Sequence, residues 1–140
     1  MEGDGHGSEL QKLARDLLER VTGLTAVYVS DAYGVPLVQA AKSSGVNDEA
    51  ARTMAATFAV AVDQVNKLQL GKNESVVSFF SDLVVVHINH LPLVITFFLE
   101  EAEEANVGLL LSLGQDLKKV LEPLRKSVAQ MDSDSGAQRD

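Results

Sequence analysis

The residues from Ser30 to Ala41 read SDAYGVPLVQAA, in which an Asp and a Gly stand three positions apart between two apolar runs. A calcium-binding loop would need several oxygen ligands at alternate positions, but Asp31 is followed by Ala32 and Tyr33. A phosphate-binding loop would need more glycines and would lead into a helix. Asp at the first position and Gly at the fourth are typical of a type I turn. The stretch therefore predicts a hairpin between two strands, with no chemistry of its own.

The sequence on both sides of this hairpin alternates between helical and strand periodicity. The pattern predicts, in chain order, a helix from Ser8 to the terminating Gly23, strands at Leu24–Ser30 and Val35–Ala41, a helix from the N-cap Asn47 to Leu68, strands at Ser75–Phe80, Leu83–Asn89 and Leu93–Leu99, and a last helix from the cap Asn106 to Val128, bent at Pro123. Because Leu93–Leu99 is apolar on both faces, it should lie centrally in the sheet. The expected class is α+β, with a five-stranded antiparallel sheet and helices on both faces.

Length and composition predict a single domain with polar ends. A chain of 140 residues that is 46% hydrophobic can bury one substantial core. The domain should span residues 8–130. Residues 1–7 are rich in glycine and residues 131–140 are polar, so both are expected to be flexible tails.

Charge and cysteine content exclude several classes of protein. With 12 basic and 20 acidic residues the net charge is −8, which argues against nucleic-acid binding and against adhesion to an anionic membrane. The absence of cysteine removes disulfides, thiol nucleophiles and thiolate zinc sites. The longest apolar run is interrupted by polar residues, and neither end carries a lipidation motif. We therefore expect a soluble intracellular chain.

Candidate catalytic and metal-binding residues are few. His87 and His90 are three residues apart in a strand, so they should point to opposite faces, partly exposed at a rim of the sheet, and should not share a metal. Asp31, Asp63 and Asp82 lie in three separate elements. We expect no cofactor, no metal and no catalytic residue. The glutamates that follow the last strand are read as a solvated loop: Glu100, Glu101, Glu103 and Glu104.

The second helix contains ten residues without a charge, Thr53–Val62, which read TMAATFAVAV. One apolar stripe should face the sheet, and it consists of Met54, Ala55, Phe58, Ala61, Val62 and Val65. The opposite side, with Ala56, Ala59 and Val60, is also small and apolar. A helix that is apolar nearly all round should be covered on both sides, here by a second helix at close approach. The alternative is an alanine-rich surface helix favoured by propensity alone.

Two motifs carry a resemblance to a known family. SDAYGVPLVQAA resembles the first hairpin of roadblock-type domains, although its tip is Ala32-Tyr33 where the family usually has charged residues. The block Asp63–Phe98 resembles the MEK-binding scaffold subunits of the Ragulator complex, the late endosomal and lysosomal adaptor. The matching positions are Asp63, Gln64, Lys67, Leu68, Leu70, Lys72, Asn73, Ser75, Asn89, Leu91, Pro92 and Leu93. The resemblance covers about residues 10–128.

The resemblance implies a roadblock/profilin-like fold and a non-catalytic scaffold. Its partners would be a second roadblock-fold subunit in a heterodimer, other Ragulator subunits, MEK and ERK kinases, and Rag GTPases that recruit the TOR kinase complex. A lipidated partner subunit would hold the chain at the cytoplasmic face of late endosomes and lysosomes.

The resemblance also implies where the second subunit binds, because roadblock domains pair through their second helices and through edge strands. The expected interface residues are Ala56, Thr57, Ala59, Val60, Gln64, Val76, Val77, Ser78, Phe79 and Phe80. Two alternatives remain open. One is a roadblock homodimer acting as a dynein light chain or as a regulator of a Ras-like GTPase. The other is a small enzyme with a carboxylate site in a concave pocket.

Overall fold

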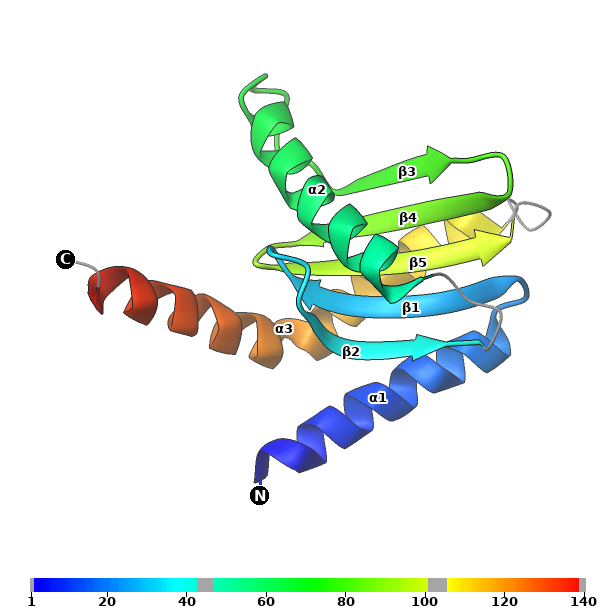
Figure 1. Cartoon of the computed structure of the whole chain (residues 1–140), viewed down its shortest axis with the longest axis horizontal. Coiled ribbons are helices and arrows are strands. Elements are labelled where there is room, and N and C mark those ends of the chain that lie inside the picture. The colour runs from blue at the N-terminus through cyan, green and yellow to red at the C-terminus, as the bar shows by residue number, and fades with distance from the viewer. Residues whose placement is uncertain (1, 43–46, 101–105, 139–140) are drawn as a thin grey trace.

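The computed structural model, which describes residues 2–42, 47–100 and 106–138, contains helices and strands in the predicted order (Figure 1). They are α1 Glu2–Arg20, β1 Leu24–Asp31, β2 Pro36–Ala41, α2 Asp48–Asn66, β3 Ser75–Phe79, β4 Leu83–His90, β5 Leu93–Glu100 and α3 Val107–Gln138. The predicted α+β class and the predicted order are confirmed.

The five strands form one sheet with the order β2-β1-β5-β4-β3, and every neighbouring pair is antiparallel. As predicted, β5 is central and buried on both faces. Leu93, Ile95, Phe97 and Leu99 belong to one buried cluster. Val94 and Phe98 point to the opposite face and join two smaller clusters.

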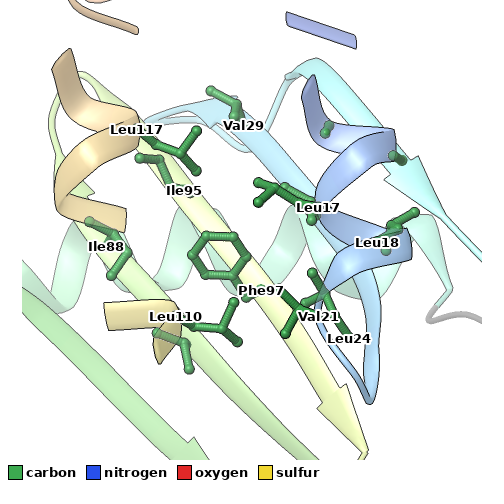
Figure 2. Close-up of a cluster of buried hydrophobic side chains, with 14 of the residues drawn as sticks. Leu17, Leu18, Val21, Leu24, Val29, Ile88, Ile95, Phe97, Leu110 and Leu117 are labelled. Carbon is green, nitrogen blue, oxygen red and sulfur yellow. The ribbon is translucent and has the colours of Figure 1, made fainter. Parts of the chain in front are cut away.

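Helices cover both faces of the sheet, as predicted. Leucines of α1 and α3 flank Phe97 on one face, with Leu17 on one side and Leu110 and Leu117 on the other (Figure 2). On the opposite face α2 is the one helix formed by the described residues, and it crosses the strands obliquely from β1 towards β3 (Figure 1). One face therefore holds the larger core, and α2 covers the other.

The predicted hairpin joins β1 to β2 and is confirmed. The Asp31 carboxylate accepts hydrogen bonds from the backbone N–H groups of Tyr33 and Val35, both at 2.9 Å. Gly34 closes the turn by donating to the Asp31 carbonyl at 3.1 Å, with a φ of +88° that favours glycine. A Cβ added at Gly34 would lie 2.3 Å from the carbonyl oxygen of Arg52, so the hairpin tip contacts the backbone of α2.

The two asparagines predicted to cap the later helices, Asn47 and Asn106, make different contacts. Asn47 caps α2 as predicted, because its side-chain oxygen accepts from Glu49 N at 2.8 Å and from Ala50 N at 3.3 Å. Asn106 precedes α3, but its side-chain amide donates to the carbonyl of Thr22. That bond attaches the start of α3 to the turn that follows α1.

Several predicted boundaries are wrong. The first helix begins at Glu2 rather than at Ser8, and the last continues to Gln138. Neither extension contains a proline, so each helix can continue beyond the leucines that pack it against the sheet. Whether the ends are flexible tails stays a prediction. The loops predicted around residues 43–46 and the acidic residues 101–105 lie outside the described residues.

Candidate partner interface

The helix α2 buries only one side. Its buried residues are Ala51, Ala55, Phe58 and Val62. Among the residues predicted to meet a partner, Thr57, Val60 and Gln64 are exposed, and the Val60 side chain is 64% accessible. Ala56 and Ala59 are half-buried. These five residues, Ala56, Thr57, Ala59, Val60 and Gln64, are called the outer face of α2 below.

The core stripe predicted for this helix is partly wrong. Ala61 and Val65 are exposed, whereas the sequence pattern placed them against the sheet. The reason is geometric: α2 runs obliquely over the strands towards β3 at the edge of the sheet (Figure 1), so less of the sheet lies beneath the last turns of the helix. The consequence is a larger exposed apolar surface than the sequence indicated, which continues to Leu70, 81% accessible.

The strand β3 forms one edge of the sheet, as expected from the resemblance. Val76 packs against the small cluster beneath α2, and Ala59 of α2 packs against the same cluster. The structure therefore brings the two halves of the predicted interface together at one border of the sheet. Val77 points the other way and packs on the larger core, while Ser78 is half-buried.

Two phenylalanines extend this edge into solvent. Phe79, the last residue of β3, is 62% accessible, and Phe80 is about half accessible. Phe80 was predicted inside the strand but lies one residue beyond it, where its N–H donates to the Leu83 carbonyl at 2.8 Å. Exposed aromatic side chains beside an edge strand are typical of a protein-binding surface.

A shallow hollow of about 350 Å³ lies on the exposed side of α2. It is lined by Tyr33, Arg52, Thr53, Ala56, Thr57 and Val60. Tyr33 comes from the hairpin tip, which Gly34 holds against the helix. The sequence pattern did not place Tyr33 or Arg52 at the candidate interface. An aromatic residue beside a glycine at a hairpin tip is the signal that could have indicated Tyr33.

The histidine prediction was half right. His87 and His90 point to opposite faces, but His87 is buried, at 4% accessibility, and is not at a rim. Its ring stacks on Phe58 of α2, with centroids 4.8 Å apart. Burial lowers the pKa of His87 to about 4, so the side chain is neutral at physiological pH. The sequence could not show this, because α2 brings Phe58 over the sheet from a distant part of the chain.

His90 contacts α3 on the other face. Its Nε2 lies 3.1 Å from a carboxylate oxygen of Glu122, although the orientation does not make a hydrogen bond. Glu122 also accepts two bonds from Arg125, which lower the pKa of Glu122 to about 2. Burial lowers the pKa of His90, and the charge of Glu122 opposes that shift. This group attaches the β4–β5 turn to α3.

A hollow of about 650 Å³ lies beside β2, and its lining residues are poorly suited to catalysis. The Tyr28 hydroxyl there donates to an Asp48 carboxylate oxygen at 2.9 Å. Burial and then Asp48 raise the pKa of Tyr28 to about 12, which is the wrong direction for a base or nucleophile. Within the described ranges there is no group of three metal-ligating side chains. No described helix is long and apolar enough to span a bilayer.

Comparison with solved structures identifies the fold. A roadblock/LC7 domain from Streptomyces avermitilis superposes with a TM-score of 0.65 at 17% identity, covering 81% of this chain and 95% of that one. The gliding protein MglB from Thermus thermophilus superposes with a TM-score of 0.63 at 15% identity, covering 88% and 90%. At these identities the likeness shows the roadblock fold alone.

Sequence comparison identifies the family. The chain is 38% identical over 120 residues to the Ragulator complex protein LAMTOR3-A of Xenopus laevis, covering 86% of this chain and 96% of that protein. It is 37% identical to LAMTOR3 of Homo sapiens over 86% of this chain, and 34% identical to the Drosophila melanogaster homolog over 87%. The family model described as mitogen-activated protein kinase kinase 1 interacting matches residues 8–128. The resemblance found in the hairpin and in Asp63–Phe98 is thereby confirmed, and the chain belongs to the mitogen-activated protein kinase kinase 1 interacting family of roadblock-fold proteins.

Proposed function

We propose that this chain is a non-catalytic scaffold subunit of a Ragulator complex, and that it pairs with a second roadblock-fold subunit through the outer face of α2 and the edge of β3. The observation that carries the proposal is Val60, which is 64% accessible in the middle of a charge-free helical stretch. The names of its relatives as Ragulator complex proteins support the assignment of the complex.

Pairing through this surface is physically favourable for two reasons. Ala56 and Thr57 are small, so a second helix can approach the backbone of α2 closely. The free side of β3 presents backbone N–H and C=O groups that a strand of the partner can satisfy. A stable interface buries about 800 Å² per partner, and the exposed side chains of Val60, Phe79 and Phe80 supply apolar area towards it.

The scaffold would bring kinases and GTPases together rather than catalyse a reaction. The family description supports binding of a MEK kinase, with ERK, Rag GTPases and the TOR kinase complex recruited by the assembly. With a net charge of −8 the chain would reach late endosomes and lysosomes through a lipidated partner subunit.

Affinity capture of the tagged chain from cells tests the proposal. The bound proteins should include one second roadblock-fold subunit in equal amount, together with other Ragulator subunits and a MEK kinase. A matched measurement is light scattering of the purified chain alone and with that subunit. Recovery of a stable homodimer that does not exchange with the second subunit would contradict the proposal and favour a roadblock homodimer.

A further inference from the structure

The two edges of the sheet are not equivalent. At one edge β3 pairs only with β4, and at the other β2 pairs only with β1. Any exposed edge strand is a template on which a strand of another chain can add. With two open edges, a roadblock domain could grow into a chain of subunits instead of forming a closed pair.

The edge of β2 is occupied by a side chain of α1. The Gln11 carboxamide donates through Nε2 to the carbonyl oxygen of Gln39, and its Oε1 accepts from the Gln39 N–H at 3.3 Å. A primary amide has the same donor and acceptor groups as a peptide unit. Gln11 therefore makes with Gln39 the two hydrogen bonds that a neighbouring strand would make.

Gln39 is the central position for strand addition. In the β1–β2 ladder it lies opposite Tyr28, between Val38 and Ala40. In an antiparallel pair, every second residue forms its backbone hydrogen bonds with the neighbouring strand. Because Lys42 N donates to Thr25 O, the residues at odd positions, Leu37, Gln39 and Ala41, turn their backbone groups away from β1. Pro36, at the start of the strand, has no N–H. The amide of Gln11 thus blocks the middle of a short edge.

The edge of β3 is less protected. The hydrogen bond from Asn89 N to Glu74 O shows which residues of β3 bond to β4. The backbone N–H and C=O groups of the alternate residues, Ser75, Val77 and Phe79, therefore point away from β4. Of the side chains in the described ranges, the amide of Asn73 reaches this edge, 3.4 Å from the Ser75 carbonyl at the start of the strand. The backbone groups of Val77 and Phe79 remain available.

We infer that Gln11 closes the β2 edge to strand addition, so that a second roadblock chain, including a second copy of this one, can join the sheet only at β3. The helix α1 carries Gln11 to this place because Ala14, Leu17 and Leu18 fix it on the sheet. This inference concerns the edge opposite to the proposed interface and stands whether or not the partner is a Ragulator subunit.

Amide hydrogen exchange of the full chain tests the hydrogen bonds. Gln11→Met keeps the length of the side chain and the helix propensity but removes both polar groups. The Gln39 amide should exchange about five-fold faster in Gln11→Met than in wild type, which corresponds to one lost hydrogen bond. The Ala41 amide points the same way and should not change. Lys12→Met, which adds the same side chain at the next position of α1, should change neither amide.

The association state tests the consequence. At equal concentration, light scattering should show species larger for Gln11→Met than for wild type, because the variant has two open edges, and Lys12→Met should match wild type. If Gln11→Met does not fold, Gln11→Ala takes its place with the same expectations. An unchanged exchange rate of the Gln39 amide would show that the Gln11 side chain does not occupy the edge of β2. Faster exchange of the Gln39 amide without larger species in light scattering would show that Gln11 does not limit strand addition.

Discussion

The imidazole of His87 in β4 stacks on the phenyl ring of Phe58 in α2, with the ring planes inclined by 14°. His87 lies in β4, between β5 and the edge strand β3, and Phe58 is one of four buried residues in the described helix α2. This contact therefore holds the helix that carries the proposed interface. Burial keeps His87 neutral, with a pKa of about 4 instead of 6.5.

The lowered pKa predicts that stability depends on pH. Between pH 6.5 and 4 the unfolded chain binds a proton at His87 that the folded chain does not bind, so the free energy of unfolding falls as the pH falls through that window. In His87→Phe, which keeps an aromatic ring on Phe58, this loss is absent. The difference in unfolding free energy between variant and wild type should shift by about 2 kcal/mol in favour of the variant from pH 7 to pH 5.

Urea unfolding at several pH values measures this shift. His90, whose pKa is also lowered by burial, is present in both proteins and cancels in the difference. A difference that stays constant between pH 7 and pH 5 would show that His87 is solvated or paired in the folded state.

The contact between the hairpin tip and α2 predicts a strong effect at Gly34. Gly34→Ala should destabilise the chain by about 3 kcal/mol, because a Cβ meets both an unfavourable φ and the carbonyl of Arg52. Gly71 is the matched control: its φ is +98° and nothing lies within 4 Å of an added Cβ. Gly71→Ala should cost about 1 kcal/mol. Equal losses for both variants in chemical denaturation would mean that the hairpin tip does not press on α2.

A second glycine, Gly114 in α3, lies where the helix packs closely against the sheet. Gly114 looks like a poor helix residue in the sequence, but a Cβ there would lie 2.6 Å from Cγ1 of the buried Ile88. Gly114→Ala should therefore destabilise by about 1 to 2 kcal/mol despite its better helix propensity. Gly108→Ala, with open space around it, should be neutral or stabilise by up to about 1 kcal/mol. Thermal unfolding shows whether each variant is more or less stable than wild type. Stabilisation by both substitutions would refute the close packing of α3 on β4.

The charge of the chain predicts its behaviour at membranes. With a net charge of −8, the purified protein should remain in the supernatant when vesicles rich in anionic lipid are sedimented at physiological salt. Addition of a lipidated partner subunit should move it to the pellet. Co-sedimentation of the chain alone would contradict attachment through a partner.

The sequence predicted the strands and the central place of β5 because their side chains alternate or are apolar on both faces. The Asp31–Gly34 turn was predictable for the same kind of reason, since its hydrogen bonds are made within a few residues. What the sequence could not provide is the angle at which α2 crosses the sheet. That angle decides that Ala61 and Val65 are exposed and that His87 is buried.

The candidate interface was predictable to a similar degree. The lack of charge in Thr53–Val62 indicates a second apolar side, and the resemblance placed β3 at an edge. Tyr33 was missed because its position beside α2 depends on how closely Gly34 approaches Arg52. Contacts between residues far apart in the chain, such as Gln11 with Gln39, leave no periodic signal in the sequence.

The central claim is that the outer face of α2 binds a second roadblock-fold subunit, and titration of that purified subunit into Val60→Glu tests it most directly. A charge without a partner in an apolar contact costs about 3 kcal/mol, so the Kd should rise by about 100-fold or more. Val120→Glu, an equivalent change at an exposed valine of α3, should bind like wild type. Both variants should unfold within about 0.5 kcal/mol of wild type, because both side chains face solvent in the free chain. Wild-type affinity of Val60→Glu would contradict the claim, and loss of folding would place Val60 in the core of the chain instead.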